Sequence, residues 1–141
     1  MDNWYYSEES AKTVKKPWGK EVWINYKKGE NIGDFKKLYV MKKLYINKNT
    51  KTSFQYHQKK TETNFLIKGS IEAWFESKPG IISIEKLNAG NIWSIPPGVK
   101  HRIITLEDVI LLEASTPEVD DVIRISDDTL RGNGRIESEH D

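Results

Sequence analysis

The chain has 141 residues, which is most simply one domain, and 37% of them are hydrophobic. The charges nearly balance, with 22 basic against 21 acidic residues, so the sequence lacks the basic excess typical of nucleic-acid-binding proteins. No cysteine is present, which excludes disulfides and thiolate metal sites.

The first residues predict an arm in front of a folded body. Residues 1–16 are polar and read as a loose arm or a short added strand. They hold no apolar stretch of the kind a signal peptide needs, and no run in the chain approaches the ~20 apolar residues of a membrane span. We therefore expect a cytoplasmic protein that partners neither a membrane nor nucleic acid.

The middle of the chain, residues 17–116, predicts a single all-β barrel. Short runs rich in Val, Ile, Tyr, Phe and Trp recur between turn signals, which is typical of antiparallel all-β folds. The nine expected strands are 21–26, 37–46, 52–57, 63–67, 71–76, 82–87, 91–95, 101–106 and 109–114. Residues 117–141 form an acidic tail with one apolar patch, which could pack on the barrel or reach a second subunit.

Two segments of this middle part concentrate the residues that can carry chemistry. In "TSFQYH", 52–57, strand alternation places Gln55 and His57 on one face. Glu62 follows after a short connection and would return close to His57 if that connection closes a hairpin. Gly69 ends this next strand, where a residue without Cβ makes a tight turn easy.

The second segment is "GNIWSIPPGVKHRIIT", residues 90–105, in which a Pro-Pro-Gly turn leads into a strand beginning at His101. Two imidazoles, a carboxylate and an amide oxygen together suit one divalent ion, Zn²⁺, Mn²⁺, Fe²⁺ or Ni²⁺. The alternative is that His57 and His101 are structural histidines and Glu62 a solvated strand residue.

Together the two segments resemble the paired motifs of the cupin superfamily. The first motif runs through Gln55, His57, Glu62 and Gly69, and the second through Gly90, Pro96, Gly98 and His101. The resemblance implies a jelly-roll β-barrel that binds one divalent metal through Gln55, His57, Glu62 and His101. The chain departs from the family pattern at three positions, which are Asn49 in place of Gly, Gln55 in place of His and Thr105 in place of Asn.

A narrower resemblance points to a substrate class. The chain is similar to the cupin domain of type II mannose-6-phosphate isomerases, often fused to a mannose-1-phosphate guanylyltransferase. The resemblance rests on "KPWGKEVW" (16–23), "SFQYH" (53–57), "PPGVKHRI" (96–103) and "EVDDVIRISDD" (118–128). It implies metal-dependent aldose–ketose isomerisation of a sugar phosphate. The stretch "HQKKTETNF" departs from that family, which usually has His, Arg and aromatic residues there.

The remaining site residues are less sharply indicated. Glu113 and Lys100 are candidates for the base, although a strand-end surface charge and a turn lysine would look the same. By resemblance Arg124 binds the phosphate, or it pairs with the acids around it. Arg102 is a second candidate, but strand alternation turns it away from His101 and so outward.

Two other functions stay open at this point. Two histidines and a carboxylate are also the ligand set of non-haem Fe(II) oxygenases, so the chain could be a cupin dioxygenase. It could also be a non-catalytic, metal-dependent sugar-binding cupin. We expect the partner to be a small sugar or sugar phosphate, and we expect a homodimer.

Overall fold

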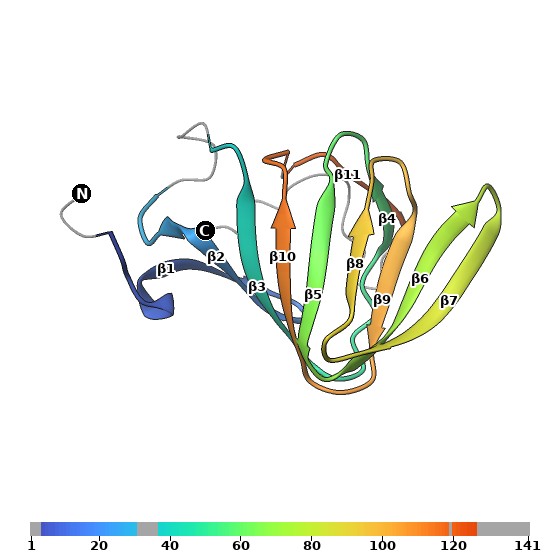
Figure 1. Ribbon diagram of the computed structural model, residues 1–141, viewed down its shortest axis with the longest axis horizontal. Helices are drawn as coiled ribbons and strands as arrows, with labels where there is room; N and C mark the ends of the chain where they lie inside the picture. Colours follow the sequence, from blue (N-terminus) through green and yellow to red (C-terminus); the bar gives the residue numbers. More distant parts are fainter. Residues whose placement is uncertain (1–3, 31–36, 119, 127–141) are drawn as a thin grey trace.

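The computed structural model describes residues 4–30, 37–118 and 120–126, and within them the protein is almost entirely β (Figure 1). The elements are η1 (Glu8–Ser10), β1 (Ala11–Lys16), β2 (Gly19–Lys27), β3 (Val40–Ile46), β4 (Phe54–His57), β5 (Glu62–Lys68), β6 (Ser70–Lys78), β7 (Ile81–Asn88), β8 (Ile92–Ile95), β9 (His101–Thr105), β10 (Val109–Ser115) and β11 (Val122–Ser126). The prediction of an all-β fold is confirmed. No helix among these residues is long and apolar enough to cross a membrane.

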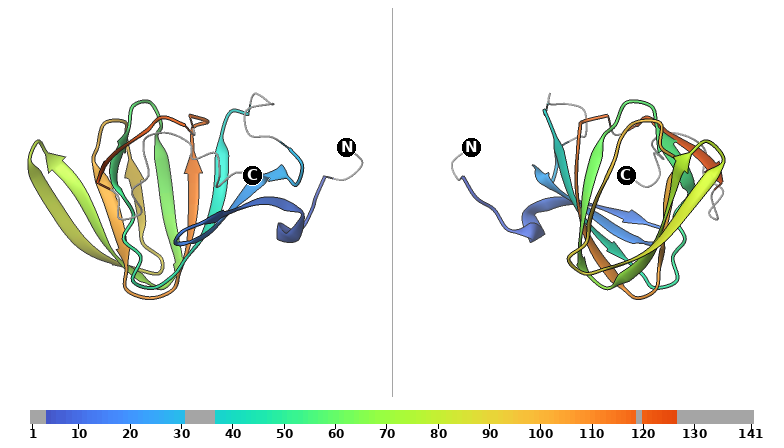
Figure 2. Two further views of the ribbon diagram at one scale, coloured as in Figure 1. Left: turned by 180° about the vertical axis from the view of Figure 1, so that it is seen from behind. Right: turned by 45° about the vertical axis from the view of Figure 1, so that its right-hand side comes forward.

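The strands form two antiparallel sheets that face each other (Figure 2). One has the order β1-β2-β3-β10-β5-β8 and the other β11-β4-β9-β6-β7. Several neighbours in each sheet come from distant parts of the chain, and β10, for example, lies between β3 and β5. Each of the nine expected strands has a counterpart, with bounds that differ by up to three residues.

Both ends of the described chain add an edge strand. The predicted arm supplies β1, which pairs with β2 and buries Ala11 and Val14. The predicted tail supplies β11, which pairs with β4. The rest of that tail, residues 127–141, lies outside the described residues, as do residues 1–3. Strands from the arm and the tail therefore extend the sheets beyond the expected barrel.

The interior divides into an apolar end and a polar end. The apolar end is a cluster of Leu44, Ile46, Leu66, Ile71, Ala73, Val109 and Leu111. Further along the same strands the inward positions are polar, and Lys42, Asn64 and Glu113 are all buried there. Because buried polar groups are costly without partners, this half of the interior is built to hold polar contacts.

Two turns behave as the motifs predict. Gly69 joins β5 to β6 at φ +91°, and a Cβ there would lie 2.6 Å from the carbonyl oxygen of Asp108. Asn49, which replaces a motif glycine, has φ 63°, a conformation that Asn accepts better than most residues. Thr105, which replaces the motif Asn, is buried and donates to the carbonyl of Asn47 at 2.6 Å, so it holds the same turn.

Candidate metal centre

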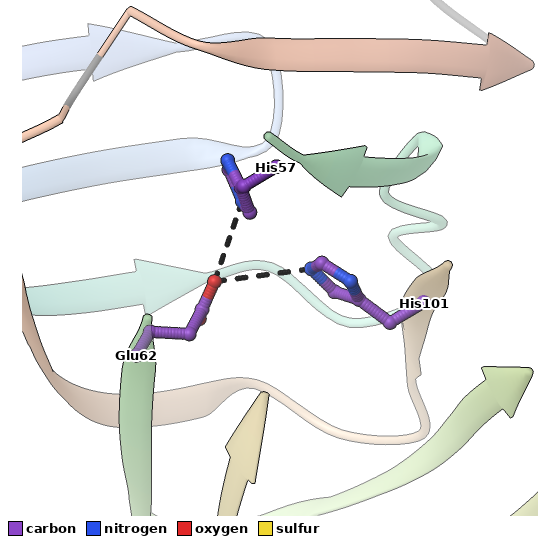
Figure 3. Close-up of side chains that lie close together, drawn as sticks. All are labelled: His57, Glu62 and His101. Carbon is purple, nitrogen blue, oxygen red and sulfur yellow. Dashed lines mark ion pairs between the residues drawn. The ribbon is translucent and has the colours of Figure 1, made fainter. Parts of the chain in front are cut away.

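Three predicted ligands meet inside the barrel, each from the end of a different strand. His57 ends β4, Glu62 begins β5 and His101 begins β9. The Nε2 atom of His57 is 3.4 Å from Glu62 Oε1, and that of His101 is 3.8 Å from the same oxygen (Figure 3). All three side chains are buried, and their candidate ligand atoms lie within 4.8 Å of one another.

Local pairing explains why these residues converge. The short connection after β4 brings Glu62 back beside His57. It does so by crossing from one sheet to the other, so β4 and β5 do not form the expected hairpin. The Pro-Pro-Gly turn is tied to the same place, since the Gly98 amide donates to the His57 carbonyl at 2.7 Å. Finally, Gln55 is the register partner of His101 between β4 and β9. The two motifs therefore join at one end of the cavity.

Outer contacts fix the orientation of both rings. His57 Nδ1 lies 3.2 Å from Asp121 Oδ1, and His101 Nδ1 lies 2.8 Å from the Val99 carbonyl oxygen. Because these partners are acceptors, each Nδ1 carries the proton and each Nε2 presents a lone pair to Glu62. Metal-binding histidines in proteins are commonly held in this way.

The donor set fits a divalent cation. Two Nε2 lone pairs and a carboxylate oxygen would repel one another without a positive charge between them. His57 Nε2 is buried and has no hydrogen-bond partner among the described residues. Burial also lowers the pKa of His101, which favours the neutral imidazole that binds metals. His57, Glu62 and His101 would therefore hold the ion.

Gln55 lies beside these three residues but has its own partner. Its side chain lines the same cavity, and its Oε1 accepts a hydrogen bond from the hydroxyl of Ser53. The structure thus brings all four predicted ligands into the lining of one cavity. Ligation by the Gln55 amide oxygen stays a prediction.

A buried lysine that the motifs did not single out lies next to the ligands. Lys60 Nζ is 3.0 Å from Glu113 Oε2 and 3.9 Å from Glu62 Oε1, and its side chain is 7% exposed. Burial on its own would lower the pKa of Lys60, but the carboxylates of Glu113 and Glu62 outweigh burial and raise it. Likewise, burial would raise the pKa of Glu62, yet the ammonium of Lys60 outweighs burial and lowers it. The Lys60 ammonium is therefore the counter-ion of both carboxylates, Glu62 and Glu113.

The other sequence candidates separate into two groups. Glu113 and Arg124 line the cavity, which has a volume of about 170 Å³. Lys100 is not part of its lining and forms a partly exposed ion pair with Glu76 at 3.7 Å. Arg102 also lies outside the lining, but it is not exposed as expected, because its guanidinium donates to the Thr52 carbonyl at 2.8 Å and lies over Trp74.

Asp121 is a residue of the candidate site that the sequence did not single out. Besides contacting His57, its carboxylate accepts hydrogen bonds from the backbone amides of Lys59 and Lys60, at 2.7 and 3.0 Å. It therefore holds the connection between β4 and β5 in place. The sequence shows it only as one of several acids in the tail, and nothing local distinguishes it.

Comparisons with solved structures agree on the architecture. A variant of oxalate decarboxylase OxdC of Bacillus subtilis superposes with TM-score 0.70 at 15% identity over 89% of this chain, which spans 33% of that protein. Streptomyces PAC13, solved with uridine, gives 0.67 at 10% identity, covering 90% of this chain and 93% of that one. An RmlC-like cupin from Shewanella frigidimarina gives 0.62 at 16% identity, covering 82% and 92%.

The sequence itself matches no protein-family model, and it matches no curated protein. At identities this low, the likeness to solved structures concerns the fold alone. The closer resemblance to mannose-6-phosphate isomerases stays a prediction. Taken with the two antiparallel sheets, these likenesses show that the chain has the cupin jelly-roll fold.

Proposed function

We propose that the protein is a metal-dependent sugar-phosphate isomerase of the aldose–ketose type, acting between mannose 6-phosphate and fructose 6-phosphate or a closely related pair. The observation that carries the proposal is the buried Lys60–Glu113 pair beside the His57, Glu62 and His101 cluster. One cavity thus combines a metal site with a carboxylate that is not needed as a ligand. That the enzyme works as a cytoplasmic homodimer stays a prediction.

Each residue has a defined task in this proposal. A divalent ion bound at the cluster would act as a Lewis acid on the sugar carbonyl and the adjacent hydroxyl. Glu113, on β10, takes the proton from one of the two sugar carbons and returns it to the other, while the hydroxyl proton passes from one of the two neighbouring oxygens to the other, so that hydroxyl and carbonyl exchange places. Such proton transfer typically contributes about 10²–10⁴-fold to the rate. Lys60 Nζ lies within 4 Å of carboxylate oxygens of both Glu113 and Glu62. Its ammonium can therefore donate a hydrogen bond to the sugar oxygen that becomes negative during the proton transfer.

The test is isomerase activity of the metal-loaded protein. We expect interconversion of mannose 6-phosphate and fructose 6-phosphate, with deuterium from D₂O appearing at the reacting carbon. Glu113→Gln should lower kcat by at least about 100-fold while metal content is unchanged. Lys100→Gln is the matched control, and we expect it to retain activity because Lys100 lies outside the cavity lining. Metal binding without turnover of either sugar phosphate would reject the proposal.

A second function is favoured by one contact. Gln55 Oε1 accepts a hydrogen bond from Ser53, which uses one of its two lone pairs. If this contact keeps the oxygen turned away from the ion, two histidines and one carboxylate remain as ligands, with open positions. This is the ligand set of non-haem Fe(II) oxygenases. Oxygen uptake by the Fe²⁺-loaded protein would support this alternative. If the substitution Gln55→Ala weakens metal binding, the site has four protein ligands. Metal-dependent sugar binding with neither activity would indicate a binding protein.

A further inference from the structure

A row of side chains crosses the inner face of the six-stranded sheet next to the metal centre. It runs through direct register partners, Trp23 on β2, Lys42 on β3, Glu113 on β10, Asn64 on β5 and Trp93 on β8. These strands lie side by side in Figure 1. All five side chains line the cavity. We call them the polar row.

The polar row differs from the next row on the same face. The partners there are Leu44, Leu111 and Leu66, which are buried in the apolar cluster. Packing alone would therefore favour apolar residues at 42, 64 and 113 as well. Glu113 and Asn64 have explained roles, since one pairs with Lys60 and the other donates to Glu62 at 3.0 Å. Lys42 is the member whose position the metal site and the base do not explain.

Among the residues that the structure describes, the ammonium of Lys42 has one ion-pair partner and one aromatic neighbour but no hydrogen-bond acceptor. Its side chain is 9% exposed, and its Nζ lies 4.2 Å from the centroid of the Trp23 ring. Glu21 is its ion-pair partner at 3.9 Å, beyond hydrogen-bond distance, and that carboxylate oxygen already accepts from the Trp23 indole at 3.1 Å. An ammonium carries three donors, and a buried one is costly unless they are satisfied. Lys42 is thus suited to an acceptor that enters through the cavity.

The charge of the cavity favours an anion as that acceptor. Its lining contains four cationic side chains, Lys16, Lys42, Lys60 and Arg124, against three carboxylates, Glu21, Glu62 and Glu113. A divalent ion at the histidines would add two further positive charges. A concave site with an excess of positive charge attracts negatively charged ligands.

The position of Lys42 indicates which part of a ligand it would contact. β3 and β5 are separated by β10 alone, so two strand spacings, about 10 Å, lie between the backbones of Lys42 and Asn64. Asn64 in turn contacts the metal ligand Glu62. A ligand that reaches from the metal centre to Lys42 is therefore a small metabolite, in keeping with a cavity of about 170 Å³.

We propose that Lys42 is the specificity-determining residue of the cavity and binds the anionic end, a phosphate or a carboxylate, of a small ligand whose other end lies at His57, Glu62 and His101. The proposal rests on the function proposed above for the same site. It adds that the non-reacting end of the substrate is charged and that β3 recognises it. Glu21 and Trp23 hold the ammonium in place for that contact.

The experiment compares three sugars that differ only at carbon 6, mannose 6-phosphate, mannuronate and mannose. Their affinities for the metal-loaded protein are measured by calorimetry for wild type, Lys42→Met and Lys43→Met. Lys43 is the matched control because it is next in sequence, points out of the barrel and pairs with Glu8 at 2.8 Å. A second variant, Lys42→Met with Glu21→Gln, avoids leaving Glu21 as an uncompensated buried charge.

We expect wild type and Lys43→Met to bind one of the two charged sugars about 10- to 100-fold more tightly than mannose. The charged sugar that is preferred identifies the group as phosphate or carboxylate. Both Lys42 variants should lose this preference while their affinity for mannose and for the metal is unchanged. If they keep the preference, another cation such as Arg124 binds the anion and the proposal is wrong. It is also wrong if wild type shows no preference for either charged sugar or binds none of the three.

The two proposals fail in different ways. Charge discrimination through Lys42 without any aldose–ketose interconversion would reject the isomerase and leave the anion site standing. Interconversion at wild-type kcat and KM in both Lys42 variants would leave the isomerase standing and reject the role of Lys42.

Discussion

Lys60→Met is the substitution with the largest effect that the geometry predicts. Lys60 Nζ is the counter-ion of two buried carboxylates, Glu113 at 3.0 Å and Glu62 at 3.9 Å. Removing one partner of a buried ion pair typically costs about 3–5 kcal/mol, because the remaining charge has lost its compensation. We expect a loss of this size in the free energy of unfolding of the metal-free protein. The loss should be smaller in the metal-loaded protein, because the cation also neutralises Glu62.

The assay is urea unfolding followed by tryptophan fluorescence at pH 8, where an ordinary histidine is neutral. Lys59→Met is the matched control, since that neighbouring lysine is exposed, and we expect a change within about 0.5 kcal/mol. Lys60→Met combined with Glu113→Gln should recover part of the loss, with a coupling energy of about 0.5–3 kcal/mol. If Lys60→Met costs less than about 1 kcal/mol at an unchanged m-value, Lys60 is not the counter-ion described here.

Three further predictions address the metal site and the fold. Asp121→Asn should weaken metal affinity about 10- to 100-fold in a chelator competition, because His57 loses the partner that orients it; unchanged affinity would show that the contact is dispensable. Because burial lowers the pKa of His101, the unfolded chain takes up that proton first as the pH falls through about 6.5. The metal-free protein should therefore lose stability below that pH, measured by urea unfolding from pH 8 to 5.5, and His101→Asn should flatten the profile. Gly69→Ala should cost more stability than Gly29→Ala, although φ is similar, +91° and +87°, because only the Cβ at 69 meets backbone within 4 Å; equal thermal shifts would contradict this.

The local pattern of the sequence was enough to predict the strands and to indicate that the candidate metal ligands lie close together. Alternation along "TSFQYH" places Gln55 and His57 on one face, and the short connection after His57 keeps Glu62 near it. The Pro-Pro-Gly turn fixes how the chain enters β9 at His101. These features depend on neighbours within a few residues, and steric rules for turns and strands act over that range.

Strand alternation also indicates which charged side chains of the polar row point inward. In "VMKKLYI", Lys42 has the same parity as Val40 and Leu44, so it points inward with them. Glu113 shares its parity with Leu111 in the same way. The sequence therefore determines that these charges are buried, but not what they face.

Only the tertiary structure decides which of these side chains share a cavity. Lys60 and Asp121 are 61 residues apart, yet the Lys60 backbone amide donates to the Asp121 carboxylate. Lys42 meets Glu113 because β10 inserts between β3 and β5. Register between strands distant in sequence is set by the burial of one face of the whole sheet, which no single segment encodes. The candidate ligands could thus be proposed from the chain, whereas the charges around them depend on how the sheets close.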